Sequence, residues 1–108
     1  MICNRFDVVV VPFPFTDMPA AKRRPALVLT REEFNRHGRS IMAMITTKRE
    51  PPWPGDTPLE RFEKAGLKAP CIVRLKLFTL DNRLIQRILG SLSKTGAAAV
   101  ESHFMFLC

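Results

Sequence analysis

The chain has 108 residues, of which 46% are hydrophobic and 25% are charged. This is ordinary globular usage, so we expect one domain spanning residues 1–108, with neither a signal peptide nor a membrane span. The net charge of +7 favours a polyanionic partner, which can be nucleic acid, a membrane surface or an acidic protein.

The first half of the chain predicts three strands. Residues 8–15 form the first, and the donor-less nitrogens of Pro12 and Pro14 face one edge, so this strand should lie at a sheet margin or leave the sheet there. The polar connection over residues 16–24 is long for a hairpin turn, and such loops are often functional. Pro25 should open a second strand over residues 26–29.

Thr30 should cap a short helical turn over residues 31–34, with Glu33 at the capping-box position. Residues 41–45 read as the third strand. Three prolines within residues 50–55 predict a loop. Trp53 in this loop is interpreted as a lid over apolar surface rather than an exposed stacking residue.

The second half predicts a short helix over residues 59–66, stopped by Gly66. Residues 71–77 alternate apolar and basic side chains in their second half, which predicts a strand with one buried face, and residues 78–80 continue it. A turn at 81–83 precedes a last strand over 85–92, and Ser93 should cap a final helix. In that helix one apolar stripe contains Ala97, Val100, Phe104 and Leu107. Strand follows strand, so the prediction is a mainly β fold, a small closed or half-closed barrel with short helices.

The cysteines and histidines do not suggest a metal site. Cys3, Cys71 and Cys108 are far apart and odd in number, which predicts free thiols in a reducing compartment. His37 and His103 are too few for a metal cluster, and the carboxylates are not grouped to hold Mg²⁺. We therefore expect neither a metal nor another cofactor.

Four segments in order carry a resemblance to a known family. They are residues 10–17 (VVPFPFTD), 22–29 (KRRPALVL), 43–47 (AMITT) and 76–81 (KLFTLD). Together they resemble the MazF/PemK toxins over nearly the whole chain. Three places depart from the family pattern: Phe6 stands where a glycine is usual, residues 20–22 (AAK) replace the Gly and Glu or Gln of the first loop, and Phe78 stands where many members have an arginine.

The resemblance implies an SH3-like barrel of the MazF/PemK/CcdB type with a C-terminal helix, and a homodimer. It also implies a cytoplasmic growth inhibitor of a type II toxin–antitoxin system, neutralised by an acidic antitoxin protein and without a membrane partner. The implied activity is sequence-specific cleavage of single-stranded mRNA without metal.

Metal-free cleavage of RNA uses the 2′-hydroxyl as nucleophile, and negative charge gathers on the phosphoryl oxygens. Arg24 matches the family's arginine directly before a proline, and Thr46 matches its functional hydroxyl after an apolar strand. A guanidinium has a pKa above about 12 and is a poor base, so we expect Arg24 to stabilise charge, with Thr46 assisting. The alternatives without a catalytic role are that Arg24 is a solvated surface charge or an ion-pair partner, and that the Thr46 hydroxyl bonds to the local backbone.

Further side chains flank these two and are expected to contact the RNA. They are Lys22, Arg23, Thr47, Lys48, Arg49, Arg74 and Lys76. As a group they would neutralise phosphates and make binding sensitive to salt.

Two other functions remain open on the same fold. A CcdB-like toxin that poisons DNA gyrase would depend on C-terminal residues, and residues 103–108 are apolar enough to serve, although burial in the core or a dimer is favoured. A catalytically inactive RNA- or partner-binding domain would retain the basic loops.

Overall fold

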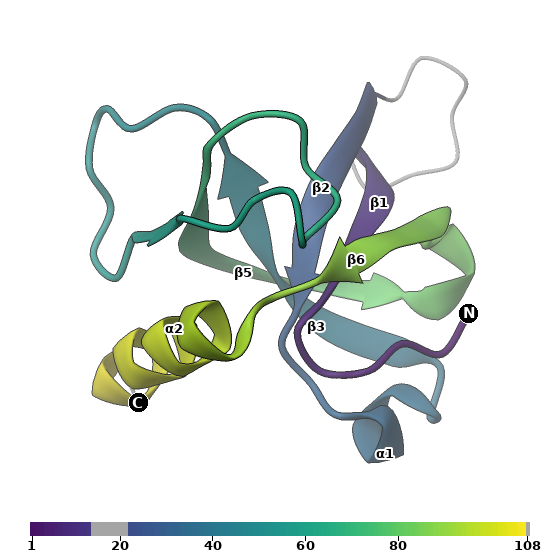
Figure 1. Cartoon of the computed structure of the whole chain (residues 1–108). Helices are drawn as coiled ribbons and strands as arrows, with labels where there is room; N and C mark the ends of the chain where they lie inside the picture. The colour runs from purple at the N-terminus through teal and green to yellow at the C-terminus, as the bar shows by residue number, and fades with distance from the viewer. Residues whose placement is uncertain (14–21, 108) are drawn as a thin grey trace.

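Six antiparallel strands form one sheet in the order β4-β5-β3-β2-β1-β6, which curls into a half-barrel (Figure 1). The structure is a computed structural model, and it describes residues 1–13 and 22–107. The strands are β1 (Asp7–Phe13), β2 (Lys22–Val28), β3 (Arg39–Thr46), β4 (Thr57–Leu59), β5 (Cys71–Asp81) and β6 (Arg87–Ser91). The helices are α1 (Glu32–Asn35), the 3₁₀ turn η1 (Asn82–Leu84) and α2 (Lys94–Leu107). The predicted mainly β class with a C-terminal helix is confirmed.

Two core clusters lie on the two faces of the sheet, because successive side chains of a strand point to opposite sides. Val8, Leu27 and Ala43 belong to one cluster, which α2 covers with Val100. Their strand neighbours Val9, Ala26 and Met42 belong to the other. The two faces of the sheet therefore carry different side chains, and neighbouring residues of one strand belong to different faces.

The prolines lie where a strand lacks a neighbour on one side. β1 pairs with β6 only up to Val10, so Pro12 lies beyond the last residue paired with β6. The first strand is thus internal over its first half and becomes an edge at Pro12, where the sequence predicted that normal pairing ends. Pro25 sits within β2 rather than at its start, because pairing with β3 begins only at Ala26. Pro14 and most of the 16–24 connection lie outside the described residues.

The helix predicted over residues 59–66 is wrong. Leu59 ends β4, and a series of turns follows. Gly66 ends this series of turns, as predicted for the end of the segment, and its backbone lies in the left-handed region with φ +78°. The N–H groups of Gly66 and Leu67 donate to the carbonyls of Glu63 (2.9 Å) and Phe62 (3.0 Å), the pattern of a helix C-terminal motif without the helix before it.

The two predicted caps have different outcomes. Thr30 does not cap α1, whose preceding residue Arg31 makes no side-chain cap bond. The Thr30 hydroxyl instead bonds the buried Asn35 side chain at 2.5 Å, a tertiary contact. Ser93 caps α2 as predicted, since its hydroxyl accepts from the Gly96 N–H at 3.1 Å. None of the described helices is long and apolar enough to cross a bilayer.

The backbone conformation at Phe6 explains why the family pattern has a glycine at this position. Its φ is +70°, the region in which glycine carries no steric penalty, so a glycine is the residue that this position favours. The phenyl ring compensates by packing against the first core cluster and beneath the Arg5 guanidinium, 4.6 Å from the ring centre.

Cys3 and Cys71 are free and buried, as predicted for structural thiols. Burial raises the pKa of both thiols, so they stay protonated near neutral pH. Cys108 lies outside the described residues.

Candidate functional site

Arg24 and Thr46 line the same hollow, of about 200 Å³, on one face of the sheet. The ladder between β2 and β3 ends at Ala26 opposite Met44, and each of the two predicted residues lies two positions further along its strand. Side chains two apart share a face, so the sheet places the guanidinium and the hydroxyl on the same side. The apolar floor contains Val11 and Phe78.

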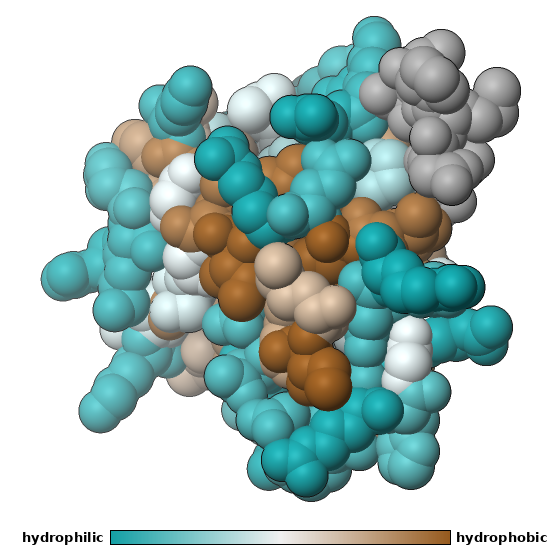
Figure 2. Space-filling view, turned by 90° about the vertical axis from the view of Figure 1, so that its right-hand side faces the viewer, coloured by the Kyte–Doolittle hydropathy of each residue, from teal (hydrophilic) through white to brown (hydrophobic). Residues whose placement is uncertain are grey.

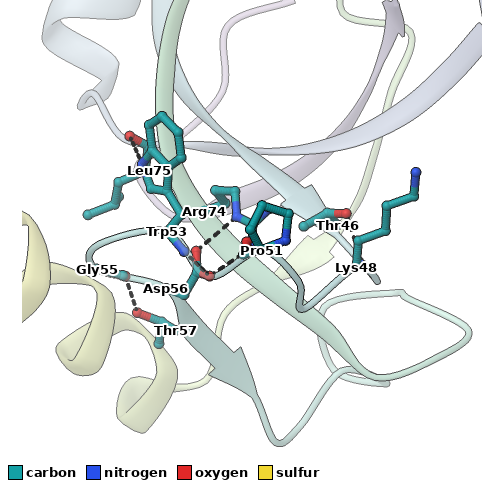
Figure 3. Close-up of polar contacts among 9 residues, drawn as sticks. All are labelled: Thr46, Lys48, Pro51, Trp53, Gly55, Asp56, Thr57, Arg74 and Leu75. Atoms are coloured by element: carbon teal, nitrogen blue, oxygen red, sulfur yellow. Dashed lines mark hydrogen bonds and ion pairs between the residues drawn. The ribbon is translucent and has the colours of Figure 1, made fainter.

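The Thr46 hydroxyl is oriented by the backbone. Its oxygen accepts a hydrogen bond of 3.1 Å from the Lys48 N–H, just past the end of β3 (Figure 3). This bond uses an oxygen lone pair and leaves the hydroxyl hydrogen to donate elsewhere. Among the described residues it has no other partner. A hydroxyl fixed in this way can donate to an anion placed in the hollow.

Arg24 is exposed at the rim of β2, opposite Val11 of β1. Four arginines of the described chain form ion pairs with carboxylates, and Arg24 is not among them. The neighbouring cations Lys22, Arg23 and Lys48 are exposed as well, and Lys48 lines the same hollow. Positive charge therefore gathers around the hydroxyl, and no acidic side chain of the described residues lines the hollow.

Arg74 was predicted to contact RNA, but in the structure its guanidinium contacts Asp56 and Pro51 instead. The residue is buried, and its Nε and Nη2 atoms donate to the two carboxylate oxygens of Asp56 at 3.0 and 2.8 Å. Nη2 also donates to the Pro51 carbonyl at 3.1 Å (Figure 3). These contacts occupy the fork and hold the loop before β4 against β5, so we correct Arg74 from an RNA contact to a loop anchor. The guanidinium also lowers the pKa of the Asp56 carboxyl.

Trp53 caps this anchored loop. Its indole N–H donates to the Leu75 carbonyl at 3.3 Å, and the Lys76 ammonium lies 4.6 Å from its ring centre. The ring therefore packs over β5, in line with the lid interpretation, although 40% of the residue stays exposed. The Lys76 ammonium is exposed, but it already contacts this ring and so is only partly available to RNA. Thr47 and Arg49 lie just beyond β3 and are exposed.

The histidines lie away from the hollow's lining. His103, in α2, has its Nδ1 atom 2.6 Å from the Thr57 hydroxyl, a contact between helix and β4 that fits the expected structural role. His37 is exposed in the turn after α1. Within residues 1–13 and 22–107 no group of three or more His, Cys, Asp or Glu side chains could hold a metal ion.

A second hollow contains basic residues that the sequence did not single out. Lys68 and Arg87 line it together with Arg23. Nothing in their local sequence marks them, because they meet only through the packing of the turn before Gly66 against β6.

A family model described as PemK-like, MazF-like toxin of type II toxin–antitoxin system matches residues 4–107. Among solved structures, the Mycobacterium tuberculosis toxin MazF-mt6 is 23% identical, with a TM-score of 0.72 over 90% of each chain. A MazE–MazF complex from Deinococcus radiodurans is 20% identical, with a TM-score of 0.77 over 99% of this chain and 96% of that one.

An endoribonuclease in complex with its cognate antitoxin, from a mycobacterial species, is 15% identical, with a TM-score of 0.75 over 96% and 92% of the two chains. These likenesses show a common fold. No curated protein sequence matches the chain. Since the family model covers nearly its whole length, the chain belongs to the PemK-like, MazF-like toxins of type II toxin–antitoxin systems.

Proposed function

We propose that this toxin is a metal-independent endoribonuclease that cuts single-stranded mRNA in the cytoplasm. The observation that carries the proposal is the solvent-open hollow that Arg24 and Thr46 share and that the cation Lys48 also lines. A flexible single strand can enter such a shallow site, and its phosphates are attracted to the positive rim.

In this mechanism the 2′-oxygen of a nucleotide attacks the adjacent phosphorus, and the bond from phosphorus to the 5′-oxygen breaks. The 2′-hydroxyl loses a proton, the 5′-oxygen gains one, and the products end in a 2′,3′-cyclic phosphate and a 5′-hydroxyl. The Arg24 guanidinium and the Thr46 hydroxyl donate to the non-bridging oxygens as their negative charge grows. Donors that are held in place before the reaction stabilise the transition state more than the ground state.

The test is cleavage of a long single-stranded RNA by the purified protein in EDTA, with both product ends mapped. Arg24→Ala should lower the rate about 100-fold, the value of one well-placed oxyanion donor. Arg31→Ala removes an exposed charge outside the hollow and serves as the matched control. If Arg24→Ala cuts as fast as Arg31→Ala, Arg24 has no part in the chemistry.

An acidic antitoxin is the second part of the proposal. Two of the structural neighbours are toxin–antitoxin complexes. The net charge of +7 suits an acidic segment that folds as it binds. A short acidic reading frame directly upstream, whose product co-purifies with the toxin and stops cleavage, would support this partner; a solitary gene would count against it.

The homodimer is also a proposal. Figure 2 shows hydrophobic surface across the middle of one face, framed by hydrophilic side chains. Several large apolar residues of the described chain are exposed, among them Phe13, Leu77 and Ile88. Exposed apolar surface of this kind is typical of an association surface. Sedimentation at low protein concentration would distinguish dimer from monomer.

One observation favours a second candidate, a CcdB-like gyrase poison. Met105 and Phe106 at the end of α2 are 69% and 92% exposed, so neither lies in the core of the chain, and burial in a dimer, the other expectation for this end, stays a prediction. They could contact a large enzyme. DNA breaks that require gyrase while RNA stays intact, abolished by Phe106→Ser, would favour this function over cleavage of RNA.

A further inference from the structure

The second hollow, of about 740 Å³, lies beside the start of β2. It is lined by Arg23, Lys68, Gln86 and Arg87 over an apolar floor that includes Val10. Among residues 1–13 and 22–107, no acidic side chain is part of this lining. Arg24 also lines this hollow, so four cations face it without a carboxylate among the described lining residues. Like charges so placed repel each other, and an anion is the ligand that would relieve this repulsion.

Arg23, Lys68 and Arg87 form no ion pair with another described residue. The ion pairs of the described chain involve Arg5, Arg36, Arg74 and Arg83. Arg23, Lys68 and Arg87 are all exposed. Their charges are therefore available to a ligand from outside.

The position of Lys68 is fixed by two glycines that interlock. A Cβ on Gly66 would lie 2.2 Å from the Leu89 carbonyl oxygen, and a Cβ on Gly90 would lie 2.6 Å from the Lys64 carbonyl oxygen. The turn and β6 thus touch backbone to backbone, which only glycine allows. This contact brings the residues after Gly66 beside the start of β6, where Arg87 lies. The walls of the hollow are therefore held together by close backbone packing.

The two hollows meet at β2. Arg24 lines both of them, and Arg23 lines only the second. Neighbouring residues of a strand point to opposite faces, so the two arginines straddle the rim of the sheet. A chain of phosphates that crosses this rim would meet Arg24 on one side and Arg23, Lys68 and Arg87 on the other.

We propose that the second hollow is a phosphodiester-binding subsite that holds the RNA backbone next to the site of cleavage. The inference rests on the proposed function for its choice of RNA over an acidic protein segment. Continuity with Arg24 favours RNA, because one polyanion would then fill both hollows. The guanidinium forks of Arg23 and Arg87 suit phosphate oxygens.

The experiment measures binding rather than cleavage. A fluorescein-labelled 2′-O-methyl RNA of random sequence, about 12 nucleotides long, carries the phosphates but no 2′-hydroxyl nucleophile, and its Kd is measured by anisotropy over a range of salt concentrations. The test variant is Lys68→Gln/Arg87→Gln. Arg31→Gln/Lys94→Gln is the control, which removes the same charge from exposed positions that line neither hollow.

Each lost phosphate contact reduces the slope of log K against log salt by about 0.7, so the test variant should lose about 1.4 in slope. Relative to its value at about 1 M salt, the Kd of the test variant at about 0.1 M should therefore be raised about 25-fold over that of the unmodified protein. The control should leave the slope unchanged, and the charge-conserving variant Lys68→Arg/Arg87→Lys should restore it.

A test variant with the same slope as the control overturns the subsite. The same conclusion holds if that variant instead weakens binding of a polyglutamate peptide, which would assign the hollow to an acidic protein segment. Because this RNA cannot be cleaved, failure here is separate from failure of Arg24→Ala to slow cleavage, which bears on the proposed function alone.

Discussion

Gly66→Ala tests how closely the turn before Lys68 is joined to β6. At φ +78° an alanine is strained by about 1–2 kcal/mol. Its Cβ would lie 2.2 Å from the Leu89 carbonyl oxygen, and relieving such overpacking costs about 2 kcal/mol more. The sum is about 3.5 kcal/mol. With an unfolding entropy of about 2.1 cal/mol/K per residue, the melting temperature should fall by about 15 °C.

Gly38→Ala is the matched control for this variant. Gly38 also has a positive φ, +106°, but a Cβ there meets nothing within 4 Å. Only the backbone strain applies, so the fall should be about 7 °C. Thermal unfolding followed by circular dichroism and calorimetry gives both values. Equal destabilisation by the two substitutions would refute the contact between the turn and β6, and with it the argument that the second hollow is rigidly built.

Three more predictions concern the polar contacts. Asp56→Asn should lower the melting temperature by roughly 10 °C because it leaves Arg74 buried without its carboxylate, whereas Glu32→Gln, in an exposed pair, should change it by about a degree. The pKa of Asp56 is lowered and that of Asp81 falls to about 2, so both carboxylates stabilise the fold above about pH 4. Urea midpoints should therefore drop between about pH 4 and 2, and a flat profile would contradict both pairs. Asn35→Ala should cost about 3 kcal/mol in urea unfolding, since its fully buried amide donates to the Cys3 and Thr30 carbonyls.

Thr46 offers a prediction about activity in the same series. Thr46→Ser keeps the hydroxyl and should retain most of the cleavage rate, whereas Thr46→Val removes it at similar volume and should lose about tenfold or more. Rates with saturating RNA would separate the two, and equal rates would remove the hydroxyl from the mechanism.

Much of the fold was predictable from local patterns. Short apolar runs placed β1, β3 and β5 to within a few residues, and Ser93 with its following apolar stripe placed α2. These signals work because a strand or helix must present one apolar face to a core. Arg24 and Thr46 also came from sequence, through their place in ordered motifs, and their roles stay predictions.

Other features depended on contacts between segments far apart in the chain. The burial of Arg74 requires Asp56, which lies 18 residues away, and no local pattern announces that pair. The composition before Gly66 predicts a helix, but the chain forms turns there, and its backbone lies against that of β6. Burial, charge pairing and close backbone approach are properties of the folded arrangement, so tertiary structure alone decided which cations became anchors and which stayed exposed.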